Sequence, residues 1–206
     1  MIKKDFEKER KKQLEGEVRG KKLLLHSCCA PCCSGVIDRL VDFFDITIYF
    51  YNPNINSEEE FNKRANEQIR FVKEKYGDKI RVIIEEYAKQ DFLSAVKGLE
   101  NEPERGIRCD KCFYLRLEKT FNYALQNGFD FITTTLTVSP YKNANLINAI
   151  GEKICKDNEK VKWLYADFKK GNGYLTSIEN SKKYSLYRQD YCGCEFSLRD
   201  VQNRKN

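Results

Sequence analysis

Seven of the nine cysteines stand in three short groups that could bind metal or carry out redox chemistry. The groups are Cys28, Cys29 and Cys32, then Cys109 and Cys112, and last Cys192 and Cys194. A Cys-x-x-Cys spacing lets two thiolates converge on one metal ion or cluster, and several such groups together supply the four thiolates of a [4Fe-4S] cube. Because the groups lie far apart in the chain, the fold must bring them together.

Zinc is the alternative occupant of such a site, since four thiolates also form a closed tetrahedral structural zinc centre. One zinc ion would leave three of the seven thiols without a role, and this surplus favours a redox centre. A disulfide between Cys192 and Cys194 would close a very small, strained ring that is easily reduced. We interpret this pair as a redox shuttle or as additional iron ligands.

Four other residues have chemistry of their own but weaker signals. Cys33 and Cys155 fall within predicted helices, and we expect both to be packed as small hydrophobic side chains. His26, the only histidine, directly precedes the first cysteine group, yet a lone histidine beside a core is usually packed and hydrogen-bonded. Asp167 ends a predicted strand and is a candidate oxygen ligand or proton donor, with a helix cap or a surface ion pair as the alternative.

The composition predicts one compact domain that works in a reducing compartment. The chain has 206 residues, 41% of them hydrophobic, and its net charge is +6. The longest apolar runs, such as 46–51, are far too short to cross a bilayer, and residues 1–22 contain no apolar stretch that could serve as a secretory signal. We therefore expect a cytoplasmic protein without a membrane partner, in which clustered cysteines bind metal or do redox chemistry. The charge permits a polyanionic partner without establishing one.

Alternating strand and helix patterns predict an α/β fold, with a Rossmann-like parallel sheet flanked by helices. Residues 1–20 read as a charged N-terminal extension outside the core, and 21–206 as a single α/β catalytic domain. Within it, 168–206 should form a C-terminal lid or side lobe that carries Cys192-Gly193-Cys194. Strands are predicted at 22–27, 45–52, 79–87, 129–136 and 161–167, and helices at 33–44, 57–77, 91–99, 111–127 and 144–156. The first cysteine group then lies at the carboxyl end of a strand, where open α/β sheets bind their ligands.

Six sequence blocks together resemble the cobalamin-independent epoxyqueuosine reductases, the QueH family. They stand in that family's order between about residues 22 and 197, and the blocks are Leu25-His26-Ser27-Cys28-Cys29-Ala30-Pro31-Cys32, Tyr51-Asn52-Pro53-Asn54-Ile55, Arg108-Cys109-x-x-Cys112-Phe113-x-x-Arg116-Leu117, Ser139-Pro140-Tyr141-Lys142-Asn143, Asp167-Phe168-Lys169-Lys170 and Tyr187-Arg188-Gln189-x-Tyr191-Cys192-Gly193-Cys194. The sequence departs from the family at Cys33, where a small hydroxyl residue is more usual.

The resemblance implies reduction of the epoxide of epoxyqueuosine, in the anticodon loop of tRNA, to the alkene of queuosine. It implies that the reaction does not use cobalamin. It also implies an electron donor, which the sequence does not identify. It also implies a [4Fe-4S] cluster with the ligands Cys28, Cys29, Cys109 and Cys112, and a redox-active pair made of Cys192 and Cys194.

The family further suggests an additional iron ion, held by two thiolates and a carboxylate. The candidate thiolates are Cys32, Cys192 and Cys194, and Asp167 is the candidate carboxylate. A metal ion with an open position would act as a Lewis acid on the epoxide oxygen, and a nearby acid would protonate that oxygen.

Binding of tRNA should divide between basic groups that hold phosphates and aromatic rings that stack on a splayed base. The predicted lining residues are Lys142, Lys169, Lys170, Arg188, Tyr141 and Tyr187. A solvated basic face is the alternative reading of these side chains.

Two other functions remain open from the residues alone. A tRNA sulfur transferase of the ATP-pyrophosphatase type begins with the same strand, loop and helix, so the fold can be shared. Its phosphate-binding Ser-Gly-Gly-x-Asp-Ser loop is replaced here by Ser27-Cys28-Cys29-Ala30-Pro31-Cys32, which lacks the glycines that cradle phosphate. The second alternative is a non-enzymatic, zinc-stabilised RNA-binding module, which would be colourless and indifferent to oxygen.

Overall fold

A computed structural model of the protein describes residues 4–205 and has a five-stranded parallel sheet at its centre. The strands are β1 (Lys21–His26), β2 (Phe44–Phe50), β3 (Arg81–Ile84), β4 (Phe131–Thr134) and β5 (Lys162–Trp163). Their order is β3-β2-β1-β4-β5, so β1 pairs with β2 on one side and with β4 on the other. The chain changes direction across the sheet at β1, and open sheets bind ligands at such a point. The predicted Rossmann-like α/β fold is confirmed.

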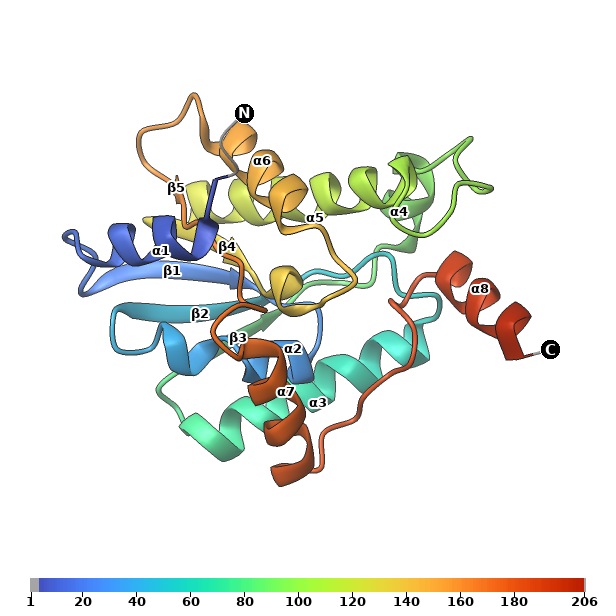
Figure 1. Ribbon diagram of the computed structural model, residues 1–206, viewed down its shortest axis with the longest axis horizontal. Coiled ribbons are helices and arrows are strands. Elements are labelled where there is room, and N and C mark those ends of the chain that lie inside the picture. Colours follow the sequence, from blue (N-terminus) through green and yellow to red (C-terminus); the bar gives the residue numbers. More distant parts are fainter. Residues whose placement is uncertain (1–3, 206) are drawn as a thin grey trace.

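Helices cover both faces of the sheet. They are α1 (Phe6–Leu14), α2 (Ala30–Ser34), α3 (Glu58–Tyr76), α4 (Lys89–Ala95), α5 (Ile107–Gln126), α6 (Ala144–Cys155), α7 (Gly173–Lys183) and α8 (Glu195–Lys205), with the 3-10 turns η1 (Ile37–Arg39) and η2 (Thr135–Val138). Figure 1 shows α5 and α6 on one side of the sheet, α2, α3 and α7 on the other, and α8 at the far end from α1. Because strand side chains alternate between faces, Leu23 and Leu25 pack in one core cluster and Leu24 in the other.

Helix α3 has the boundaries that its capping residues predict. The Ser57 hydroxyl accepts a hydrogen bond from the Glu60 amide at 3.2 Å and satisfies one of the free N–H groups of the first turn. Gly77 ends the helix at a φ of 63°, a conformation that glycine adopts without steric cost. The prediction of a helix from Ser57 to Gly77 is therefore confirmed.

The helix predicted at 33–44 is wrong. Helix α2 covers only Ala30–Ser34, and η1 follows after Gly35. The cause is a tertiary contact, since a Cβ atom at Gly35 would lie 2.4 Å from the Gly173 carbonyl oxygen of α7. Close approach of α7 to Gly35 thus replaces the longer amphipathic helix that the apolar spacing suggested.

Other boundaries also differ from the predicted ones, since β3, β4 and α4 are shorter than expected, and two more differences concern the site and the sheet edge. Helix α5 begins at Ile107 instead of 111, which places Cys109 in its first turn. Strand β5 has two residues instead of seven. The Leu164 amide still donates to the Ile132 carbonyl of β4 at 2.9 Å, and on the outer edge a side chain takes the place of a further strand. The Gln13 amide group donates to the Trp163 carbonyl and accepts from the Tyr165 amide, both at 2.9 Å. It thereby extends the hydrogen-bonding of the sheet edge beyond β5.

Part of the N-terminal segment packs against the sheet. Phe6 is buried and stacks on the ring of Tyr165, with 5.8 Å between the ring centroids. Val18 belongs to the same buried cluster as Leu23 and Leu25. This apolar contact makes α1 a cover for the edge of the sheet.

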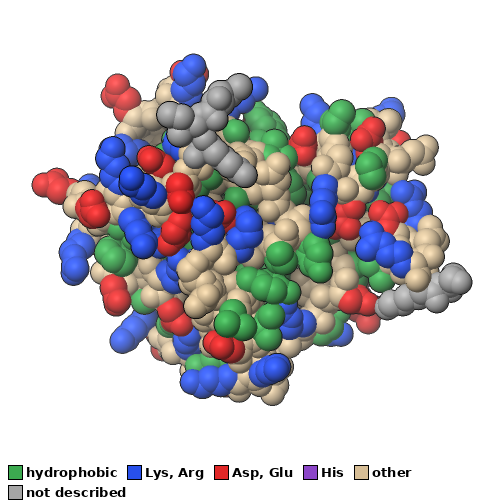
Figure 2. Space-filling model, viewed as in Figure 1, with side chains coloured by type: hydrophobic (Ala, Val, Ile, Leu, Met, Phe, Trp, Pro, Cys, Tyr) green, Lys and Arg blue, Asp and Glu red, His purple; other side chains and the backbone are tan. Residues whose placement is uncertain are grey.

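The C-terminal segment follows an irregular path over the sheet. Helix α7 packs on α2, and the segment that carries Cys192 then leads to α8 (Figure 1). The division of the chain into an extension, a domain and a C-terminal lobe stays a prediction. Lys and Arg side chains are interspersed with Asp and Glu on the face in Figure 2. Among residues 4–205, no helix has the length and apolarity needed to cross a membrane.

Replacing Gly35 by alanine should destabilise the fold. The added methyl group would meet the Gly173 carbonyl oxygen and, at 3.1 Å, the Ser177 Cβ atom. Overpacking of this kind costs about 1–3 kcal/mol, and urea unfolding followed by circular dichroism would measure it. Gly16→Ala is the matched control, because its nearest neighbour would be the Gln13 carbonyl at 3.4 Å, and its effect should stay within about 0.5 kcal/mol. Equal stability of the two variants would contradict the packing argument.

Candidate metal and active site

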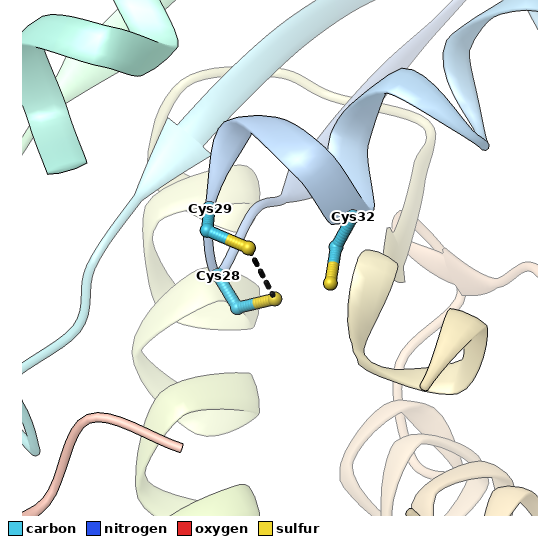
Figure 3. Close-up of side chains that lie close together, drawn as sticks. All are labelled: Cys28, Cys29 and Cys32. Atoms are coloured by element: carbon cyan, nitrogen blue, oxygen red, sulfur yellow. Dashed lines mark hydrogen bonds between the residues drawn. The ribbon is translucent and has the colours of Figure 1, made fainter. Parts of the chain in front are cut away.

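The first cysteine group forms a compact set of thiols at the carboxyl end of β1. Cys28 and Cys29 follow the strand, and Cys32 lies in α2. The three Sγ atoms lie within 4.8 Å of one another, and those of Cys28 and Cys29 are 3.9 Å apart. Figure 3 shows the Cys28 and Cys29 thiols pointing toward each other, with the Cys32 thiol on the same side. We call these three residues the cysteine triad.

The spacing of the triad suits a metal ion. With metal–sulfur bonds of about 2.3 Å, two thiolates on one tetrahedral ion stand about 3.8 Å apart, close to the distance between Cys28 and Cys29. Within the described residues, no other set of three cysteine, histidine or acidic side chains meets the same distance limit. The triad could therefore bind a metal ion and leave a fourth position open.

Hydrogen bonding within the triad concentrates negative charge on one sulfur atom. The thiols of Cys28 and then Cys32 donate to Cys29 and lower the pKa of Cys29 well below its usual value, against the opposing effect of burial. The same bonds raise the pKa values of Cys28 and Cys32. Gln189 adds a further side-chain hydrogen bond to Cys29. The thiolate that first attracts a cation is therefore that of Cys29.

The neighbouring strand fixes the orientation of Cys28. Thr135 begins η2 directly after β4, and its hydroxyl oxygen accepts a hydrogen bond from the Cys28 amide at 3.1 Å. The same hydroxyl group lies 3.4 Å from Cys28 Sγ and donates to it. Pairing of β1 with β4 thus positions this thiol.

The triad lies in the wall of a cavity of about 570 Å³. Side chains from η2, the loop before α6, α5 and the C-terminal segment complete the wall, among them Arg116, Tyr141, Lys142, Gln189 and Cys192. Ligand sites of about 300–1,000 Å³ enclose molecules of drug size. The cavity is therefore large enough for one flipped nucleoside.

A buried positive charge favours an anionic occupant next to the triad. Arg116 has an exposed fraction of 2%, and it forms no ion pair with a carboxylate of residues 4–205 within 4.0 Å. It donates to two neutral groups, the His26 Nε2 atom at 3.3 Å and the Asn52 amide oxygen at 2.5 Å. Burying an unpaired cation costs several kcal/mol. A thiolate-ligated centre, which is negatively charged, would compensate this cost, so the residues fit such a group.

His26 is a structural residue of this network. It is fully buried, and its Nδ1 atom lies 2.8 Å from the Thr134 hydroxyl oxygen. The Arg116 Nε–H donates toward Nε2 at 3.3 Å, and the same ring atom lies 3.2 Å from the Tyr51 carbonyl oxygen, so both ring nitrogens are engaged. Burial, followed by the charge of Arg116, lowers the pKa of His26 to about 3. The prediction of a packed, hydrogen-bonded histidine is confirmed.

The second cysteine group lies beside the cavity on α5. Cys112 is buried, and Arg116, one helical turn further along, donates a hydrogen bond to it. Burial raises the pKa of Cys112 to about 11, although Arg116 opposes this. The Sγ atom of Cys109 accepts from the Arg105 amide at 3.3 Å. The Sγ atoms of Cys109 and Cys112 are not close enough to those of the triad to share one metal ion with them. Their role as cluster ligands therefore stays a prediction.

The third cysteine group is divided between two environments. Cys192 lines the cavity, whereas Cys194 is buried in an apolar cluster with Cys112 and Phe196. All nine cysteines are free thiols, so the predicted disulfide between Cys192 and Cys194 is not supported. The intervening Gly193 has a φ of 124°, and Cys194 Sγ accepts from the Ser197 amide at the start of α8. These contacts hold Cys194 away from the cavity wall.

Asp167 lies in a neighbouring cavity rather than in the wall of the cysteine cavity. It is mostly buried and pairs with Lys169, and the residues around it include Lys142, which lines both cavities. Its role as a metal ligand or proton donor stays a prediction. Cys33 and Cys155 are buried in separate core clusters, as predicted.

The residues predicted to contact tRNA fall into three places. Lys142, Tyr141 and Arg188 line the cysteine cavity, and the ring of Tyr141 is 63% exposed. Lys169 and Lys170 line the neighbouring cavity. Tyr187 lines neither described cavity, and its hydroxyl group donates to Glu60. Tyr141, Lys142 and Arg188 therefore have the most direct access to a base in the cysteine cavity.

Two functional residues were missed by reasoning from the sequence. Arg116 is four residues after Cys112 on a predicted helix, and this spacing puts both side chains on one face. That signal was available in the sequence. Gln189 gave no comparable signal, because its contact with Cys29 joins residues from opposite ends of the chain. Its Oε1 atom is buried in the cavity wall without a hydrogen-bond partner among the described residues.

Comparison with known proteins agrees with the geometry. Residues 23–200 match the family model described as epoxyqueuosine reductase QueH. A curated protein of that name from Histophilus somni is 45% identical over 181 residues, which cover 87% of this chain and 73% of the relative. The Streptococcus pyogenes protein of the same name is 42% identical, with 86% and 70% covered. The one from Thermotoga maritima is 36% identical, with 85% and 90% covered.

The buried His26 should make the stability of the metal-free protein depend on pH. Its folded pKa of about 3 lies below its usual 6.5, so the unfolded chain binds the extra proton and stability falls as the pH drops below 6.5. Between pH 7.5 and 5.5 the wild-type protein should lose about 1.4 kcal/mol more than His26→Asn, whose side chain cannot titrate. Urea unfolding of both proteins at the two pH values would measure the difference. Parallel pH profiles would show that His26 does not stay neutral when folded.

Proposed function

The chain belongs to the QueH family of epoxyqueuosine reductases, and we propose that it reduces epoxyqueuosine in the anticodon loop of tRNA to queuosine. The overall change takes two electrons and two protons, converts the epoxide to an alkene and releases the oxygen atom as water. One observation carries the proposal beyond family membership. The triad, with its thiols within 4.8 Å of one another, borders a cavity that also contains the buried Arg116.

A [4Fe-4S] cluster with the ligands Cys28, Cys29, Cys109 and Cys112 is the redox centre we propose, and when bound it supplies electrons one at a time. Its support comes from Arg116, which faces both ligand groups. Arg116 donates to Cys112, and its charge opposes the rise in the pKa of Cys28 that hydrogen bonding to Cys29 causes. One guanidinium can therefore compensate negative charge on thiolates from both parts of the chain.

A second iron ion would be held on the cavity side of the thiols. Cys32 and Cys192 have the strongest support as its ligands, because both line the cavity. Cys194 has less support, since it is buried in the cluster with Phe196. Asp167 would have to reach the metal past Lys142, which borders both cavities. The ion would serve as a Lewis acid for the epoxide oxygen.

The chain's own side chains bind the base and exclude water from it. Tyr141, at the rim of the cavity, offers a ring on which a splayed base can stack. The unpartnered Oε1 atom of Gln189 can accept a hydrogen bond from the edge of the base. Arg188 is held by Ser181 Oγ at 3.1 Å and contributes positive charge to the same wall. These contacts would orient the modified base with its epoxide toward the triad.

We propose that the reaction takes place in the cytoplasm, where tRNA is found, and that it uses an external electron donor and no cobalamin. The two other functions have less support. A sulfur transferase of the ATP-pyrophosphatase type needs phosphate-binding glycines after β1, where this chain has the triad. A zinc-stabilised RNA-binding module gives no reason for thiols that line a cavity of about 570 Å³.

Loss of one cluster ligand should abolish both the cofactor and the activity. After anaerobic reconstitution, the wild-type protein should be brown and contain about four sulfide ions per chain. It should also convert epoxyqueuosine in tRNA to queuosine when a strong reductant is supplied. Cys109→Ala should lose most of its sulfide and at least about 100-fold in rate, as expected when a metal ligand is removed.

Cys155→Ala is the matched control, because Cys155 is a buried cysteine of α6 that lines neither described cavity. It should keep wild-type sulfide content and activity. Full activity of Cys109→Ala would overturn the assignment of the cluster ligands. A colourless wild-type protein that binds zinc and converts no tRNA would overturn the proposed function.

A further inference from the structure

The loop before α6 holds Lys142 in a fixed position. The Lys142 amide donates to the Ser139 carbonyl at 3.2 Å. The next residue, Asn143, caps α6, and its Oδ1 atom accepts hydrogen bonds from the amides of Asn145 and Leu146 at 3.0 and 3.3 Å. The backbone is thus anchored on both sides of Lys142. Only the side chain remains free to move within the cavity.

The ammonium group of Lys142 differs from the neighbouring lysines in having no carboxylate partner. Lys169 pairs with Asp167, Lys170 with Asp5 and Lys4 with Glu152. No hydrogen bond or ion pair of the Lys142 side chain occurs with any residue between 4 and 205. Lys142 is nevertheless half-buried, in the wall that contains the triad and Cys192.

The electrostatic surroundings keep this lysine protonated. Burial acts to lower its pKa, but the thiols of Cys192, Cys28 and Cys32 raise it by more when they are ionised, so the net shift is upward. The geometry is consistent with this shift, because all three cysteines line the same cavity as Lys142. A charged donor therefore faces the thiols and has no partner among the described residues.

Epoxide reduction requires such a donor. Cleavage of the first C–O bond leaves the oxygen on the other carbon as an alkoxide, and cleavage of the second bond releases it as water. Over both steps, two electrons enter the substrate and two protons reach the oxygen. An alkoxide is about as basic as hydroxide, whose conjugate acid has a pKa of about 15.7. Even a lysine with a raised pKa can therefore protonate it.

We propose that Lys142 is a catalytic residue that donates a hydrogen bond, and then a proton, to the epoxide oxygen as the first C–O bond breaks. Solvent returns the proton to Lys142 and supplies the second one. The inference rests on the proposed function and deepens it, since it assigns the proton donor of the same site.

The other cations of the cavity cannot take this role. A guanidinium does not release its proton in proteins, which excludes the four arginines of the wall, Arg105, Arg116, Arg188 and Arg204, as acids. Two of them are also engaged, Arg116 with His26 and Asn52, and Arg188 with Ser181. Lys142 alone among the lysines lines the cysteine cavity within the described part of the chain.

An alternative role for Lys142 is to bind a tRNA phosphate, and it predicts a different phenotype. Loss of a phosphate contact weakens tRNA binding and reduces the slope of log affinity against log salt concentration by about one. It has little effect on the rate at which bound substrate reacts. A lost proton donor leaves binding intact and lowers the rate by about 10²–10⁴-fold. The two roles are therefore separable by measuring binding and chemistry independently.

The test uses reconstituted protein, epoxyqueuosine-containing tRNA and dithionite in single turnovers at saturating protein. Lys142→Met should react about 10²–10⁴-fold more slowly than wild type, while its affinity for queuosine-containing tRNA stays within about threefold and its iron content is unchanged. Lys142→Arg keeps the charge but cannot release a proton, so it should remain at least about tenfold slow. Lys153→Met changes an exposed lysine of α6, the helix that follows Lys142, and is the control that should behave as wild type.

Rescue by added amine gives a second readout. Ethylammonium should accelerate Lys142→Ala by at least about tenfold, because it can enter the space of the missing side chain and donate a proton. The proposal is overturned if Lys142→Met keeps its single-turnover rate, if it loses tRNA affinity or iron instead, or if the amine restores nothing. Inactivity of the wild-type protein under the same conditions would instead refute the proposed function, and the role of Lys142 with it.

Discussion

A guanidinium buried among neutral partners is the constraint on which the site depends. Arg116 lies beneath the cavity with His26 and Asn52 as its hydrogen-bond partners, and no carboxylate among residues 4–205 neutralises it. Burying a charge without an oppositely charged partner destabilises a protein by several kcal/mol, which is about the size of the desolvation penalty. Because Arg116 faces Cys28 and Cys112, an anionic group at these thiols would compensate its charge. The arrangement of the cavity follows from this requirement.

The sheet supplies the rigid part of the arrangement. Strand β1 is hydrogen-bonded on both sides, and its carboxyl end carries His26, which orients Arg116, and Cys28, which Thr135 orients from the neighbouring strand. Neutral His26 is essential here, because a protonated ring could not accept the Arg116 hydrogen bond. The low pKa of His26 and the position of Arg116 therefore have one cause, the burial of both groups behind β1.

Local sequence features predicted the parts of the molecule whose causes are local. The apolar run before Cys28, the capping residue Ser57 and the closing Gly77 each act through neighbours in the chain, and the predicted sheet and α3 are correct. The helix predicted at 33–44 is wrong because its end is decided by Gly35 against Gly173, 138 residues later in the chain.

The same distinction applies to the site. The grouping of the triad follows from its spacing in one loop, whereas the separation of Cys192 from Cys194 depends on Gly193 and on the start of α8. Asp167 forms its ion pair with Lys169 and not with Lys142. Which of two neighbouring lysines pairs with a carboxylate depends on side-chain conformation, and the sequence pattern does not predict it.

The residues that line the site come from the beginning, the middle and the end of the chain, so the site forms only when the whole domain is folded. The triad follows β1, Arg116 belongs to α5, and Gln189 and Cys192 come from the segment between α7 and α8. Thiolates that meet only in the folded state couple metal binding to folding, because the free energy of binding adds to that of the native state. Contact between α2 and α7 therefore has a function beyond packing. It brings the last segment, with Gln189 and Cys192, back to the end of β1, where these residues complete the cavity wall that also contains Lys142.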